Sequence, residues 1–109
     1  MKKYKQGDVL FVPFPYTDLA TTKRRPALVV SSNNTKELIL AKITSVISNS
    51  KLSHKIKEST LDFKIHKESE IITDFLSTIS EKIVQKKIGS INSQEMQLIL
   101  AKIKSNFDQ

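Results

Sequence analysis

Short apolar runs, separated by polar and turn-forming segments, make up most of the chain. The runs are rich in β-branched and aromatic residues and are bounded by Gly, Pro, Asn or Ser, which is the pattern of β-strands joined by loops. This pattern predicts strands over residues 8–14, 26–32, 37–46, 60–65, 71–79 and 86–91. Because proline cannot donate to the hydrogen-bond ladder, we expect Pro26 at the start of its strand or on a sheet edge.

Two polar segments between these runs are long for hairpin connections. Residues 15–24 (PYTDLATTKR) are turn-forming, and residues 47–59 (ISNSKLSHKIKES) are rich in lysine and serine with little periodicity. Most connections in compact domains are shorter, and long ones often carry function. We therefore predict two long loops here, and a short helical turn at residues 80–82.

The C-terminal segment changes to a helical period. Asn92 and Ser93 are good N-cap residues, and Glu95 stands three positions after Asn92, as in a capping box. The apolar residues that follow recur at helical spacing and form one face: Met96, Ile99, Leu100, Ile103 and Phe107. We predict an amphipathic helix that packs on the sheet or on a partner subunit.

Strands followed by a single closing helix predict an α+β fold that is mainly β. The expected architecture is a small barrel-like sheet of about five to seven strands with a C-terminal helix. The length of 109 residues fits one domain over residues 1–109, with a modest hydrophobic core.

The charge of the chain points to a polyanionic partner or to simple solubility. Eighteen Lys and Arg residues against eleven Asp and Glu give a formal net charge of +7. Such an excess favours nucleic acid, an anionic membrane or an acidic protein, and it also keeps a small domain soluble. The only two arginines are the adjacent Arg24 and Arg25, which suggests a place that needs planar, bidentate phosphate binders.

The apolar runs are too short to cross a membrane. None approaches the roughly 20 residues of a spanning helix, so no membrane partner is expected. The sequence contains no cysteine, which suits a reducing compartment. We therefore expect the protein to be cytoplasmic.

Several catalytic devices are missing from the sequence. There are no cysteine pairs, no HExxH motif and no clustered His, Asp and Glu with metal-ligand spacing, so no metal or cofactor is expected. Two glycines alone exclude a glycine-rich phosphate loop, and no GxSxG motif surrounds a serine.

Three polar residues stand within or beside the apolar runs. Arg25 precedes Pro26, which favours an extended backbone where a loop enters a strand. Thr44 interrupts LILAKITSV and is expected to face a cleft, and Asp74 interrupts IITDFL, where an unpaired carboxylate is costly. Each also has an ordinary explanation: Arg25 fits a surface ion pair, Thr44 a β-branched strand residue and Asp74 an edge charge.

Four segments resemble the MazF/PemK family of type II toxins. They are GDV at residues 7–9, FPYTD at 14–18, RPALVV at 25–30 and ITS at 43–45, and their order is that of the family. Farther on, DFLSTI at residues 74–79 resembles a segment that ends in a Thr-Ile pair, and the helix from Ser93 falls where the family has its last helix. The resemblance covers nearly the whole chain.

The resemblance implies an SH3-like barrel with helices that acts as a homodimer. Members cleave single-stranded RNA at short sequences, through attack of the ribose 2′-hydroxyl and without a metal. An acidic, partly disordered antitoxin holds each toxin inactive by covering the RNA groove, and a basic toxin matches such an inhibitor.

The resemblance also assigns roles to residues. Arg25 matches the catalytic arginine and is expected to stabilise the pentacovalent phosphorane, while Thr44 matches the catalytic threonine and donates to a non-bridging oxygen. Asp74 matches an acidic position of some members and is the better general base, because a guanidinium rarely gives up its proton. Seven further residues are expected to contact RNA: Lys23, Arg24, Ser45, Lys51, His54, Lys55 and Lys57.

The sequence departs from the family at two places. Ser77 stands where many members carry an arginine before the Thr-Ile pair, and residues 15–24 lack the loop histidine of some members. Neither His54, expected at solvent or phosphate, nor His66, expected at a strand end, replaces it. The alternatives are a barrel that binds a protein target, as in the gyrase-poisoning branch of this fold, or a homologue that binds RNA without cutting it.

Overall fold

The computed structural model describes residues 3–15, 22–33, 36–48, 50–65 and 67–108. Six strands form one antiparallel sheet in the order β4-β5-β3-β2-β1-β6. The strands are β1 (Asp8–Pro15), β2 (Thr22–Ser31), β3 (Glu37–Thr44), β4 (Ser53–Lys55), β5 (Glu70–Ser80) and β6 (Lys86–Ser90). Two 3-10 turns, η1 (Glu58–Thr60) and η2 (Glu81–Ile83), and the helix α1 (Ser93–Ser105) complete the described elements. The predicted mainly β fold with a C-terminal helix is confirmed.

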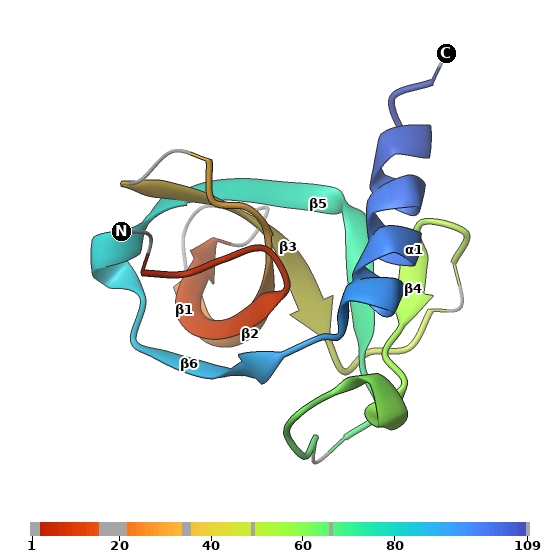
Figure 1. Cartoon of the computed structure of the whole chain (residues 1–109), viewed down its shortest axis with the longest axis horizontal. Coiled ribbons are helices and arrows are strands. Elements are labelled where there is room, and N and C mark those ends of the chain that lie inside the picture. The colour runs from red at the N-terminus through yellow and green to blue at the C-terminus, as the bar shows by residue number, and fades with distance from the viewer. Residues whose placement is uncertain (1–2, 16–21, 34–35, 49, 66, 109) are drawn as a thin grey trace.

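The sheet curls strongly (Figure 1), and the chain that follows β4 reaches the strand β6 at the opposite edge. The segment after η1 bonds to the end of β6: the amide of Asp62 donates to the carbonyl of Ser90 at 3.2 Å, and Leu61 and Ile91 form an antiparallel bridge. β5 is the long strand that bends, because its pairing with β3 shifts between Ala41 and Ile43 while its first residues also pair with β4. The result is a small, barrel-like sheet.

Both faces of the sheet are covered, which explains the continuous apolar runs. Successive side chains of a strand point to opposite faces. Val9 and Leu28 therefore join the core cluster beneath α1, whereas their neighbours Leu10 and Val29 join a second cluster inside the curl. All four side chains are 0–1% exposed.

The helix α1 begins as the sequence predicts. The side chain of Asn92 caps it by accepting a hydrogen bond from the amide of Glu95 at 2.9 Å. Met96, Ile99 and Ile103 are buried against the sheet, which confirms the predicted face. Phe107 is the exception: α1 ends before it, and its side chain is 72% exposed.

The Gly-Asp pair at the start of β1 has a structural reason. Gly7 has a φ of +98°, a conformation that glycine adopts without strain. The buried Asp8 accepts hydrogen bonds from the amide of Lys5 and the hydroxyl of Ser90, both at 3.0 Å, and pairs with Lys87. Asp8 thus ties the N-terminal turn to β6.

The predictions of two loops and one strand need correction. Residues 47–59 contain β4 and η1, so they are not one long loop, and β2 begins at Thr22 inside the other predicted loop. Residues 60–65 do not form a strand, because only Leu61 finds a partner to pair with. Leu61 and Phe63 nevertheless pack against the core, so the alternating burial that the sequence indicates is present without the ladder.

Pro26 and the predicted helical turn follow expectation. Pro26 lies within β2 and pairs with Phe11 of β1, while the pairing of β2 with β3 begins only at Ala27. Pro26 is therefore on an edge on the β3 side, where it interrupts no ladder. The predicted turn at residues 80–82 is η2, capped by the Ser80 hydroxyl, which accepts from the amide of Lys82 at 3.3 Å.

Candidate active site

A polar cavity opens where β2 and β3 separate. Its volume is about 210 Å³. Arg24, Arg25 and Pro26 of β2 line one side, Ile43, Thr44 and Ser45 at the end of β3 line another, and Ser69 precedes β5. The register produces this arrangement, because Ala27 and Lys42 form the first pair between β2 and β3, and the residues beyond that pair flank the opening.

Arg25 and Thr44 are both half-buried at this cavity. Arg25 is extended in β2 opposite Val12, as its position before Pro26 predicts. The Oγ1 of Thr44 accepts a hydrogen bond from the amide of Val46 at 3.1 Å, which leaves the hydroxyl hydrogen to donate to a bound oxygen. A guanidinium and a hydroxyl that share one cavity are suited to binding an oxyanion such as a phosphate.

Glu70 is a neighbour of this cavity that the sequence does not single out. It is 1% exposed and pairs with Thr44 across the ladder between β3 and β5. Its Oε1 accepts from the amide of Ser48 at 3.0 Å and from the Ser48 hydroxyl at 3.2 Å. Glu70 therefore holds the chain that leaves Thr44. Only its place at the head of an apolar run hints at this role.

A second, apolar cavity adjoins the first. It has a volume of about 270 Å³ and shares the lining residues Pro26, Ile43 and Ser69 with the polar cavity. Its remaining walls are mainly apolar, and Phe63 supplies an aromatic ring. Lys64 and Lys67, both exposed, stand at its lining as well. The two cavities, one polar and one apolar, therefore adjoin, and together they are called the depression.

Asp74 is not brought to this depression. It lies in the part of β5 between Ile71 and Leu76, where the pairing with β3 is irregular. Its side chain is exposed, and it is not among the described residues that line either cavity. The cost that an unpaired carboxylate in an apolar strand would carry does not arise, because water solvates it.

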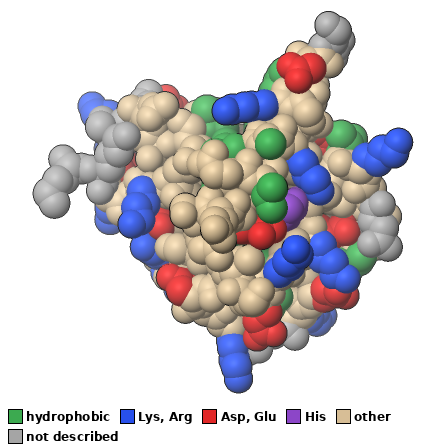
Figure 2. All heavy atoms as spheres, turned by 45° about the vertical axis from the view of Figure 1, so that its right-hand side comes forward, with side chains coloured by type: hydrophobic (Ala, Val, Ile, Leu, Met, Phe, Trp, Pro, Cys, Tyr) green, Lys and Arg blue, Asp and Glu red, His purple; other side chains and the backbone are tan. Residues whose placement is uncertain are grey.

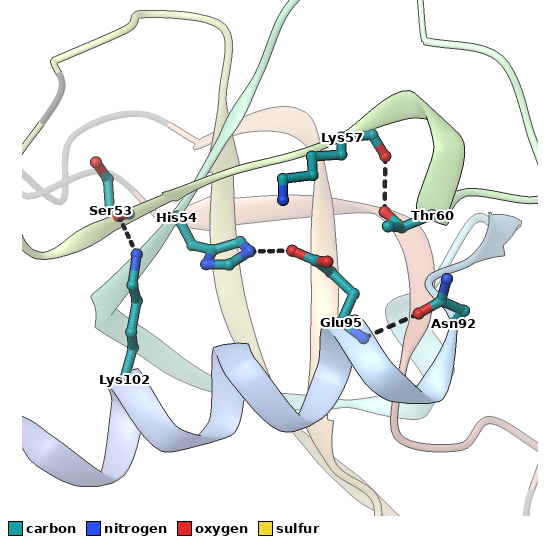
Figure 3. A network of polar contacts seen from close by, with 7 residues as sticks. All are labelled: Ser53, His54, Lys57, Thr60, Asn92, Glu95 and Lys102. Atoms are coloured by element: carbon teal, nitrogen blue, oxygen red, sulfur yellow. Dashed lines mark hydrogen bonds and ion pairs between the residues drawn. The ribbon is translucent and has the colours of Figure 1, made fainter.

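His54 requires a correction. It is 8% exposed in β4, and its Nε2 contacts Oε1 of Glu95 in α1 (Figure 3). The expected contact with solvent or phosphate is therefore wrong: the ring is packed beneath the helix. The same view shows Lys102 of α1 donating to the carbonyl of Ser53 at 3.2 Å, a second bond between these two elements. The sequence shows no pattern that pairs residues so far apart.

The lysines expected at RNA do not line either cavity, as far as their side chains are described. Lys51, Lys55 and Lys57 are exposed around β4, and Lys55 forms an ion pair with Glu68. On the face that α1 and β4 form, basic and acidic side chains are interspersed (Figure 2). The side chain of Lys23 and the whole of His66 lie outside the described residues, as does most of the predicted first loop.

Within the described part of the chain, no three His, Asp or Glu side chains gather so as to hold a metal ion. Among the same residues, no helix has the length and apolar composition needed to cross a membrane.

Solved structures share this fold. An endoribonuclease in complex with its cognate antitoxin, from a mycobacterial species, is 14% identical with a TM-score of 0.77, covering 96% of this chain and 95% of that one. The Mycobacterium tuberculosis toxin MazF-mt6 is 16% identical with a TM-score of 0.74, covering 93% and 96%. MazF from Deinococcus radiodurans is 14% identical with a TM-score of 0.77, covering 97% of both chains.

At these identities the structures establish the fold alone, and a comparison with proteins of curated function gives no match. The family comparison reaches further. The description "PemK-like, MazF-like toxin of type II toxin-antitoxin system" matches residues 5–107, nearly the whole chain. The matched region contains the six strands, the helix and the cavity of Arg25 and Thr44. The chain therefore belongs to the PemK-like, MazF-like family of type II toxin–antitoxin toxins.

Proposed function

We propose that this toxin is a metal-independent endoribonuclease that cuts single-stranded RNA at a short sequence. The observation that carries the proposal is that Arg25 and Thr44, the two residues matching the catalytic pair of the family, line one cavity. The family membership and the net charge of +7 support the same activity.

The reaction is an internal transesterification. The ribose 2′-oxygen attacks the adjacent phosphorus, the bond to the 5′-oxygen of the next nucleotide breaks, and the products carry a 2′,3′-cyclic phosphate and a 5′-hydroxyl. The 2′-proton goes to a base, and the leaving 5′-oxygen takes up a proton. No oxidant, metal or further reactant is needed for this balance.

Arg25 and Thr44 stabilise the charge that grows on the phosphorane. The guanidinium donates two parallel hydrogen bonds to non-bridging oxygens, and the Thr44 hydroxyl donates a third. Donors fixed in advance in a half-buried cavity favour the transition state more than the ground state, in which the charge is smaller.

The proton acceptor lies outside the described cavity lining. Asp74 stays the candidate on chemical grounds, since a carboxylate accepts a proton more readily than a guanidinium does. Because Asp74 is exposed and does not line the cavity, it acts only where bound RNA or a second subunit brings it to the 2′-hydroxyl.

The partners follow from the same proposal. An acidic antitoxin complements the net charge of +7, and similar solved structures include a complex of MazE with MazF from Deinococcus radiodurans. We propose that the toxin acts as a homodimer in the cytoplasm, where its RNA substrate and its antitoxin are made. Arg24, Ser45 and the lysines Lys23, Lys51, Lys55 and Lys57 are the proposed RNA contacts.

The experiment is RNA cleavage in EDTA by the wild type, Arg25→Ala and the neighbouring Arg24→Ala. We expect discrete fragments from the wild type, a loss of at least about 100-fold in rate for Arg25→Ala, as for removal of an oxyanion donor, and a weaker, salt-dependent loss for Arg24→Ala. Intact RNA with the wild type refutes the activity. Equal rates for the wild type and Arg25→Ala refute the assigned site.

A further inference from the structure

Next to the cavity of Arg25 and Thr44, the apolar cavity has no part in the phosphate chemistry. The two share Pro26, Ile43 and Ser69, so they lie side by side. Ligand pockets for drug-sized molecules occupy roughly 300–1,000 Å³. At about 270 Å³, the apolar cavity suits one planar ring system and is small for a folded peptide segment.

We propose that the apolar cavity is a nucleobase subsite that receives one base next to the cut phosphate, with Phe63 as its stacking platform. This inference rests on the proposed ribonuclease function and adds to it the residue that selects the RNA sequence.

The ring of Phe63 is held in place from behind by β6. A Cβ atom added at Gly89 would lie 2.2 Å from Cδ1 of Phe63 and 2.5 Å from Oδ1 of Asp62. The ring therefore packs directly on the glycine backbone, and Asp62 is fixed beside it because its Oδ1 accepts from the amide of Ser90 at 2.6 Å. A ring supported on one side, with a cavity beside it, is suited to stacking with a base.

The rest of the cavity fits the other parts of a nucleotide. The hydroxyl of Ser69 donates to the carbonyl of Lys67 at 3.0 Å, so its oxygen accepts from an amino or imino group on the edge of a base. Lys64 and Lys67 are exposed at the lining, where they face the phosphates of neighbouring nucleotides. An apolar side chain of a protein partner would leave the Ser69 acceptor unused, so this acceptor favours a nucleobase.

The first test is the cleavage preference of Phe63→Leu, which keeps an apolar side chain but removes the ring. On a random RNA pool we expect the wild type to select a base at one position beside the cut, and Phe63→Leu to lose that preference. On the preferred RNA, kcat/KM is expected to fall about 5- to 150-fold, the range for loss of one base–aromatic stack. Phe63→Tyr restores the ring and is expected to restore both.

Phe75→Leu is the matched control. Phe75 is also a half-buried phenylalanine, packs against the second core cluster and lies outside both cavity linings. Phe75→Leu is therefore expected to keep the wild-type base preference. Urea unfolding of each variant shows whether a loss of activity follows from a loss of folded protein.

The second test measures stacking without cleavage. A 2′-O-methyl RNA of the preferred sequence cannot be cut, and 2-aminopurine placed at each position in turn loses fluorescence where it stacks. We expect quenching at one position with the wild type and with Phe75→Leu, but not with Phe63→Leu. Equal quenching and equal base preference in Phe63→Leu and the wild type would overturn the subsite. It would also be overturned if Phe63→Leu changed only the inhibition of the toxin by a protein partner and left base preference and quenching unchanged. A wild type that cuts no RNA would instead overturn the proposed function.

Discussion

The contact between His54 and Glu95 yields a sharp prediction about stability. The two side chains are 10% and 8% exposed, and they connect β4, a strand of three residues, to the first turn of α1. Removing one partner leaves the other buried without its hydrogen-bond counterpart, which costs about 1–3 kcal/mol. We therefore expect Glu95→Ala to lower the free energy of unfolding by about that amount.

The helix itself does not account for such a loss. Alanine is a better helix former than glutamate, so the intrinsic propensity favours the variant. The loss of a negative charge near the helix N-terminus costs only about 0.3–1 kcal/mol. Glu95→Gln retains a neutral hydrogen-bonding side chain and is expected to lose less than Glu95→Ala. A loss of unfolding free energy in Glu95→Ala that exceeds this helix contribution therefore reports the contact with His54.

Far-UV circular dichroism during urea unfolding measures the effect, with linear extrapolation to water. A loss of 3 kcal/mol in a domain of this size also lowers Tm by roughly 12 °C or more. Glu68→Ala is the control, because its ion pair with Lys55 has both side chains 55% exposed and is worth about 0–1 kcal/mol.

A double variant separates burial from pairing. The Nδ1 of His54 is buried and has no hydrogen-bond partner among the described residues. Replacing both partners by leucine removes every buried polar atom of the pair, so the double variant is expected to be more stable than Glu95→Ala. The reasoning is refuted if Glu95→Ala loses no more than Glu68→Ala does.

Three further predictions concern the site. Gly89→Ala pushes Phe63 and Asp62 from their positions and is expected to cost about 1–3 kcal/mol of unfolding free energy, measured in urea; an unchanged midpoint would contradict the packing. Thr44→Val removes the hydroxyl and is expected to reduce kcat in RNA cleavage about 100-fold or more, whereas Thr44→Ser keeps most of it; equal losses would exclude a hydrogen bond. Lys67→Ala is expected to lower RNA affinity and to reduce the slope of log K against log salt by about 1; an unchanged slope would exclude a phosphate contact.

The sequence predicts the strands well where both faces are apolar. Val9 and Leu10 are buried on opposite faces of β1, so this strand appears in the sequence as a continuous apolar run. Such a run can be recognised from neighbouring residues alone. β4 has no such signal. Its His54 is buried because Glu95, far away in the sequence, lies against it in the fold. Local patterns carry no information about that pairing.

The site divides in the same way. Thr44 ends β3, and Arg25 lies in β2 two residues before the first pair with β3, so predicting these two neighbouring strands brings the residues together. Ser69 and Phe63 reach the depression through a segment without a ladder, whose path depends on contacts such as that of Phe63 with Gly89. The family resemblance and the place of Asp74 in an apolar run predict it at the site, but Asp74 lies in the irregularly paired part of β5 and is exposed.

The most direct test of the proposed activity is the chemistry of the cut ends. The wild type is incubated in EDTA with an RNA that it cuts and with the same RNA carrying a single 2′-deoxy nucleotide before the cut phosphate. Attack by the 2′-hydroxyl predicts 2′,3′-cyclic phosphate and 5′-hydroxyl ends from the first RNA and no cut at that position in the second. Cleavage of the 2′-deoxy RNA at the same position, or 5′-phosphate ends, would contradict the mechanism assigned to Arg25 and Thr44.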